Sequence, residues 1–140
     1  MASRDVRNIE PMIGIADGCE VLTSPAVKNG RGANVPRYVL VALNGPTPEG
    51  DEEELERWYR EVHMPDLKSV TGIKTARRYK TVRGKIPGID LLPYVAIYEI
   101  ETDNIDAVST EMQTKLRPFH ADFDRTRSAH IFAIQIAGDD

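Results

Sequence analysis

The sequence predicts an α+β fold with an antiparallel sheet, and two observations carry this prediction. Four segments are rich in β-branched, aliphatic and aromatic residues, as strands are. Two further segments carry apolar residues at the spacing of an amphipathic helix. In chain order from residue 37 these segments follow the pattern β-α-β-β-α-β, which is the ferredoxin-like motif, with two helices on one face of a four-stranded sheet.

The first strand and first helix carry the clearest signals. Residues 37–44 (RYVLVALN) are dense in aliphatic side chains and end at a Gly-Pro turn. The helix follows a run of four acidic residues, 51–54, which suits the positive end of the helix dipole. Leu55, Trp58, Tyr59 and Val62 then repeat at i, i+3, i+4 and i+7, which predicts one apolar stripe. Because the residue before a proline avoids helical dihedrals, we expect the helix to end at Pro65.

The remaining elements follow with less regular patterns. Residues 73–81 alternate without an entirely apolar face, which favours an edge strand or a strand lining a polar cleft. Residues 94–100 and 130–136 predict two more strands, and residues 104–115 predict the second helix, with Asp103 or Asn104 as its N-cap.

Residues 1–36 form a separate N-terminal arm in this interpretation, and residues 37–140 form the domain. The arm contains many glycines and prolines and no clean periodicity. Several predicted strands are apolar on both sides, so the sheet face opposite the helices needs a cover. We therefore expect a homodimer that pairs two sheets face to face.

Composition excludes several classes of partner and site. The formal net charge of −4 argues against nucleic acid as the main partner. No apolar run is long enough to span a bilayer, and no secretory signal is visible. Cys19 is the single cysteine, which excludes an internal disulfide and leaves a cytoplasmic location as the expectation. As a nucleophile, Cys19 would need a base that the arm does not supply locally.

The motif around the first helix resembles the dimeric α+β barrel superfamily, in particular its EthD-like small-domain proteins. The matching residues are Leu43-Asn44-Gly45-Pro46, the pair Trp58-Tyr59, His63-Met64-Pro65, the Gly72 turn and Arg77-Arg78-Tyr79. The resemblance covers residues 37–137 and leaves the arm unexplained. It implies a ferredoxin-like domain that forms a barrel as a dimer. Since the superfamily includes cofactor-free monooxygenases, lactone isomerases, polyketide cyclases, dehydratases and lyases, it implies the fold better than the reaction.

By this resemblance, the site lies in a cleft between helices and sheet, with His63 at its edge. His63 is then a general acid or base, since its ordinary pKa is near neutral; the competing interpretation is a histidine that caps the helix end. Tyr59 then forms a wall of the site or donates a hydrogen bond through its hydroxyl, and Trp58 forms a wall on which a planar substrate could stack. Asp66 either orients the imidazole or caps a loop.

Further candidates come from the strands. Tyr79, Tyr98 and Tyr94 offer hydroxyls to the cleft or, alternatively, pack in the core or dimer interface. Arg77 and Arg78 alternate, so at most one faces the cleft, where it would suit a substrate carboxylate or enolate; the competing interpretation, which the exposed setting favours, is a surface salt bridge.

His130 is the candidate for a second acid or base. The three histidines, at 63, 120 and 130, lack the spacing of a zinc site, so we expect no metal and no cofactor.

The leading functional hypothesis is a cofactor-independent lyase, isomerase, cyclase or dehydratase. It would move a proton on a small aromatic, polyketide or lactone-like metabolite. Two alternatives stay open: a cofactor-free monooxygenase of a phenolic substrate, and a non-catalytic module that binds a hydrophobic ligand or serves an assembly.

Overall fold

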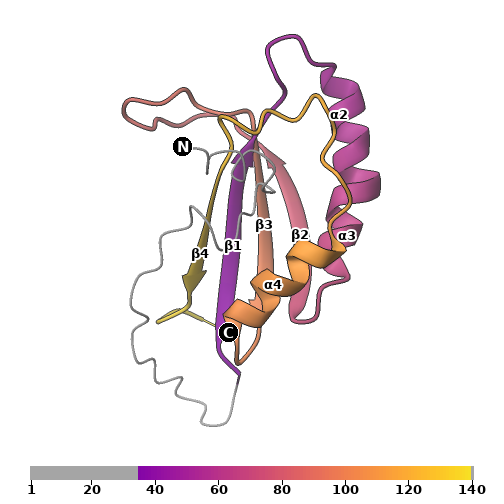
Figure 1. Cartoon of the computed structure of the whole chain (residues 1–140). Coiled ribbons are helices and arrows are strands. Elements are labelled where there is room, and N and C mark those ends of the chain that lie inside the picture. The colour runs from indigo at the N-terminus through magenta and orange to yellow at the C-terminus, as the bar shows by residue number, and fades with distance from the viewer. Residues whose placement is uncertain (1–34, 140) are drawn as a thin grey trace, which may run out of the picture.

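The computed structural model describes residues 35–139 as a four-stranded antiparallel sheet with helices packed on one face (Figure 1). The predictions on the arm, including Cys19, fall on residues 1–34 and lie outside the described residues. The strands are β1 (Arg37–Asn44), β2 (Ile73–Lys80), β3 (Tyr94–Glu101) and β4 (Ala129–Ile134). Their order in the sheet is β2-β3-β1-β4, so β2 and β4 are the edges. The predicted sequence of strands and helices is confirmed, and the sheet of the single chain is open rather than closed into a barrel.

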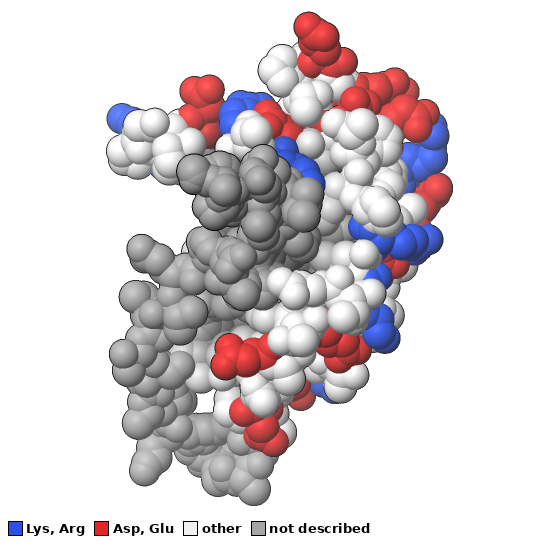
Figure 2. Space-filling view, in the orientation of Figure 1, with Lys and Arg blue, Asp and Glu red and all other residues white. Residues whose placement is uncertain are grey.

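The first helical segment is longer than predicted and contains three parts: α2 (Glu52–Trp58), a π-helical turn η1 (Tyr59–His63) and α3 (Met64–Lys68). Asp51 caps its start by accepting hydrogen bonds from the N–H groups of Glu53 and Glu54, at 3.0 and 3.1 Å. Acidic side chains gather over this end of α2 (Figure 2).

The prediction that Pro65 ends the helix was wrong. A proline ring inside a regular α-helix clashes with the carbonyl four residues earlier. Here the wider π-helical turn precedes it, and Pro65 occupies the first turn of α3, where a missing N–H costs little. The chain therefore remains helical as far as Lys68.

The second helix, α4 (Ile105–Lys115), has its N-cap at Asn104, one of the two positions that the sequence predicted. The Asn104 side chain accepts a hydrogen bond from the N–H of Ala107 at 3.1 Å and so caps the first turn. Val108 and Met112 are its buried residues. Among the described residues, no helix is both long and apolar enough to cross a membrane.

One core lies between the helices and the sheet. Side chains from both helical segments and from three strands contribute to it, together with Phe123 from the irregular segment that follows α4. Its members are Leu40, Ala42, Leu55, Tyr59, Leu67, Val70, Ile73, Ala96, Tyr98, Ile100, Val108, Met112 and Phe123. Burial of these side chains is the main source of stability for a domain of this size.

The other face of the sheet carries an apolar patch, and no described helix covers it (Figure 1). The register places Ile97, Val41 and Ile131 side by side in one row, and Val95, Leu43 and Ala129 in the next. Ile131 is 59% exposed. A contiguous apolar surface of this kind marks an interaction site more often than a solvated surface.

Candidate functional site

His63 lies in the interior, enclosed by aromatic rings. Its ring stacks on Trp58 with centroids 4.9 Å apart and an interplanar angle of 22°. Tyr59 meets it edge-on at 4.8 Å, and Phe119 lies 5.0 Å away. The His63 side chain has no exposed surface. The resemblance implied a histidine at the edge of a cleft, whereas the structure places this ring within the core.

The π-helical turn directs Tyr59 and His63 inward together. The N–H of Met64 donates to the carbonyl of Tyr59, five residues earlier, which is the hydrogen bond of a π-helix. Both Tyr59 and His63 are buried, while Arg60 and Glu61 between them are exposed. Single π-helical turns occur frequently at functional sites because they change the direction of one side chain.

Burial dominates the electrostatics of His63. Desolvation lowers the pKa of His63 from 6.5 to about 3, and the nearby Arg78 acts in the same direction, whereas Asp66 opposes it. Neither ring nitrogen has a hydrogen-bond partner among the residues that the structure describes. The imidazole is therefore neutral at physiological pH.

Asp66 does not orient the imidazole. Its carboxylate accepts hydrogen bonds from Arg117, from Nη2 at 2.7 Å and from the backbone N–H at 2.9 Å. These bonds join α3 to the segment after α4 and hold the pKa of Asp66 below its usual value, against the raising effect of burial. The alternative interpretation, a carboxylate that caps a neighbouring loop, fits this geometry.

A chain of polar side chains runs from the core to the surface beside the aromatic cluster formed by Trp58, Tyr59, His63 and Phe119. It begins with a 3.0 Å hydrogen bond between the hydroxyls of Tyr98 and Tyr59. Asn44 donates to the Tyr59 hydroxyl at 3.5 Å and accepts from Arg78 Nη1 at 3.1 Å. Arg78 Nε donates to Glu56 at 2.8 Å. We call these five residues the polar chain; it joins β3, η1, β1, β2 and α2.

Burial raises the pKa of the Tyr59 hydroxyl and, further, that of Tyr98. Both tyrosines therefore remain protonated and can act as hydrogen-bond donors. The Arg78 guanidinium lies over the Tyr59 ring at 3.7 Å and the Tyr94 ring at 4.3 Å, so two aromatic faces hold it in a cation–π sandwich. Burial, followed by a hydrogen bond to Glu52, raises the pKa of Tyr94 to about 12.

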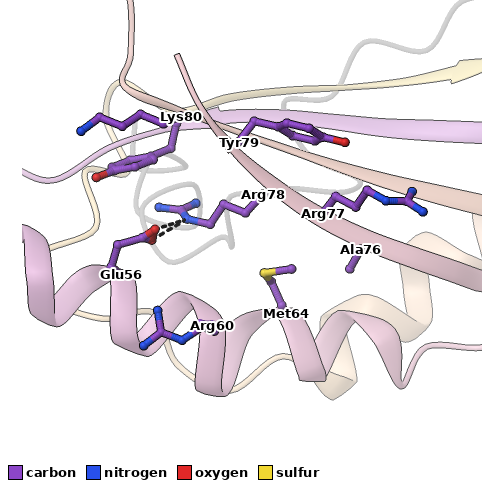
Figure 3. A pocket seen from close by; sticks show the side chains of 9 residues that line it. Glu56, Arg60, Met64, Ala76, Arg77, Arg78, Tyr79 and Lys80 are labelled. Carbon is purple, nitrogen blue, oxygen red and sulfur yellow. Dashed lines mark hydrogen bonds and ion pairs between the residues drawn. The ribbon is translucent and has the colours of Figure 1, made fainter. Parts of the chain in front are cut away.

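The polar chain ends in a surface groove between β2 and the first helical segment (Figure 3). The groove has a volume of about 670 Å³, within the range typical of small-ligand sites. Glu56 and Met64 point from the helix toward β2. Its lining residues are Glu56, Arg60, Met64, Ala76, Arg77, Arg78, Tyr79, Lys80 and Tyr94.

The structure brings five of the seven predicted site residues together. Trp58, Tyr59 and His63 belong to the aromatic cluster, and Tyr59 is linked to Tyr98 and Arg78 through the polar chain. Of the two alternating arginines, Arg78 is the one on the helix-covered face, and its side chain is 8% exposed.

Tyr79 and His130 lie apart from this group. Tyr79 lines the outer rim of the groove but is 46% exposed, on the face opposite Arg78. His130 is on β4, at the other edge of the sheet, and its nearest ring is that of Phe132 at 6.3 Å. Burial lowers the pKa of His130.

Sequence reasoning did not single out Asn44, Glu56, Arg60 or Lys80 as site residues. Asn44 was visible as a strand end, and it is fully buried because it bridges Tyr59 and Arg78. Glu56 is one of several acidic residues in the first helical segment, and only its ion pair with Arg78 on β2 distinguishes it from the others. No cluster of three or more potential metal ligands occurs within residues 35–139.

A scan against protein-family models and searches of curated proteins and solved structures found no match to this chain.

Proposed function

We propose that the chain is a cofactor-independent enzyme that moves a proton on a small aromatic, polyketide or lactone-like metabolite bound in the groove. The reaction would be of the lyase, isomerase, cyclase or dehydratase type. The observation that carries the proposal is the polar chain, which joins buried hydroxyls to a groove of ligand size. Buried polar networks are costly to build, so a network that opens onto a groove favours a functional role.

Glu56 is the better-placed proton acceptor in this scheme. Its carboxylate lines the groove and is about one-third exposed (34%), so a bound substrate can contact it. His63, enclosed by rings, has a pKa of about 3, which makes it a weak base at neutral pH. Arg78 then stabilises negative charge that develops on the substrate oxygen.

Two variants separate these assignments. We expect Glu56→Gln to lower turnover at least 100-fold, the usual range for loss of a general base, and His63→Ala to act mainly through stability. Glu53→Gln, an exposed carboxylate of the same helix outside the groove, is the matched control. The substrates to screen are phenols, aromatic acids and lactones. If Glu56→Gln keeps full turnover while His63→Ala folds correctly and loses turnover, then His63 rather than Glu56 is the general base.

The monooxygenase alternative is tested in the same screen. It requires molecular oxygen, so its product would disappear under anaerobic conditions, whereas proton transfer would continue.

A non-catalytic binding module is the second candidate. The observation that favours it is the enclosure of His63, the only histidine of the first helix, whose nitrogens have no hydrogen-bond partner within residues 35–139. A compound that binds in the groove and is never converted, with Glu56→Gln leaving its affinity unchanged, would support this role.

We also propose that the domain has the ferredoxin-like topology of a dimeric α+β barrel, formed by two copies through the open sheet face. The rows around Val41, Ile97 and Ile131 supply the apolar surface that such a dimer would bury. Ile131→Glu tests this: the side chain is 59% exposed, so the monomer tolerates the change, whereas a dimer buries two charges. Sedimentation should report a dimer for the wild type and a monomer for the variant; a monomeric wild type would refute the pairing.

A further inference from the structure

We infer that the ligand of the groove carries a carboxylate, which binds beside Arg78 on the β2 side of the groove. This inference rests on the proposed function, since it names the class of substrate for the same groove. Three observations support it: the sign of the charge along the groove, the state of the Arg78 guanidinium and the apolar part of the lining.

The groove concentrates positive charge on a chain whose net charge is −4. Arg60, Arg77, Arg78 and Lys80 line it, against the one carboxylate of Glu56. Arg77 pairs with Glu99 at 3.7 Å, on the outer side of β2. Arg60 and Lys80 form no ion pair in the part of the chain that the structure describes. Their charges are available to attract and hold an anion.

Arg78 supplies a donor that lacks an acceptor. Its Nε is bound by Glu56 and its Nη1 by Asn44, whereas Nη2 is buried and has no hydrogen-bond partner among the described residues. A buried donor without a partner is unfavourable, and more so on a charged group. A carboxylate oxygen is the acceptor that a guanidinium N–H binds best.

The carboxylate reaches Nη2 only when a neighbouring side chain turns aside, because Nη2 is out of contact with solvent. Met64 and Lys80 line the same groove, and both have long, flexible side chains that can move at low cost.

The rest of the lining favours an organic monoanion over a phosphate. Met64, Ala76 and the Tyr94 ring offer apolar contact for the body of a small molecule. The Glu56 carboxylate lies 2.8 Å from Arg78 Nε and repels a dianion more strongly than a monoanion.

The test is a titration of the full chain with benzoate, with the neutral benzamide of the same shape and with inorganic phosphate. Binding is followed by amide chemical shifts of β2 and of the first helical segment. We expect benzoate to bind at least tenfold more tightly than benzamide or phosphate, and to weaken as salt rises. The double variant Arg60→Gln/Lys80→Gln should bind benzoate about tenfold more weakly.

Lys68→Gln/Lys74→Gln is the matched control, because it removes the same charge from exposed positions of α3 and β2 outside the groove. Benzamide binding as tightly as benzoate, or an equal loss in the control, would overturn the inference. If benzoate binds as expected but no compound is converted, the carboxylate site stands and the enzymatic proposal falls. If neutral lactones are converted and benzoate does not compete, the enzymatic proposal stands and the carboxylate site falls.

Discussion

The buried imidazole of His63 predicts an acid sensitivity that one substitution should remove. In the described part of the chain the two nitrogens of this ring have no hydrogen-bond partner, and His63→Leu replaces the ring with an apolar side chain of similar size. At pH 7.5 the two effects of this change oppose each other. Loss of stacking on Trp58 costs about 0.5–1.5 kcal/mol, whereas removal of unsatisfied buried nitrogens contributes about 1–3 kcal/mol. We expect the free energy of unfolding to change little, or to rise, at this pH.

The difference in the free energy of unfolding between His63→Leu and the wild type grows as the pH falls. The folded chain keeps His63 neutral down to about pH 3, whereas the unfolded chain takes up a proton near the ordinary pKa of 6.5. Between these values the unfolded state binds more protons, so stability is lost as the pH falls. The loss reaches about 1.36 kcal/mol for each pH unit once the unfolded histidine is fully protonated, and it amounts to about 2.3 kcal/mol between pH 6.5 and 4.5.

The assay is urea unfolding of the wild type and of His63→Leu at pH 7.5, 6.5, 5.5 and 4.5, followed by far-ultraviolet circular dichroism. Carboxylates titrate in the same range, but they are present in both proteins, so the difference between the two curves isolates His63. We expect the variant to gain about 2.3 kcal/mol on the wild type between pH 6.5 and 4.5. Parallel curves would refute the reasoning, because they would mean that His63 takes up a proton in the folded chain as readily as in the unfolded one.

Three further substitutions test separate contacts by the same unfolding assay. Asp66→Ala removes the acceptor of both the Arg117 side chain and its backbone N–H, and should cost about 1–2 kcal/mol; an unchanged midpoint would mean that the pair contributes nothing. Tyr98→Phe should cost about 1 kcal/mol, because it breaks the 3.0 Å bond to the Tyr59 hydroxyl; equal stability would argue that this bond is absent in solution. Gly72→Ala should cost about 1–2 kcal/mol, because Gly72 has φ of +100° and an added Cβ would lie 3.1 Å from a backbone carbonyl oxygen; a neutral result would show that this turn relaxes.

Local patterns predicted the elements because each of them depends on near neighbours in the chain. Residues 37–44 were predicted as a strand from their aliphatic content, and β1 has the same bounds. Asp103 or Asn104 was predicted as the cap from residue type, since a short polar side chain can reach the N–H three residues on, and Asn104 is the residue that does so. The same kind of local reasoning wrongly predicted that the helix ends at Pro65, because the π-helical turn before this proline changes where its ring lies. No local pattern indicated that turn.

The sequence by itself determined the α+β class and the order of the elements. These features follow from composition and periodicity, which depend only on residues that are close together in the sequence. Only the tertiary structure decided that Arg78 rather than Arg77 faces the helix, that Asn44 bridges two other elements, and that His63 lies beneath rings instead of at a groove. The physical reason is that each of these depends on contacts between residues distant in sequence. Phe119, for example, encloses His63 from 56 residues away along the chain.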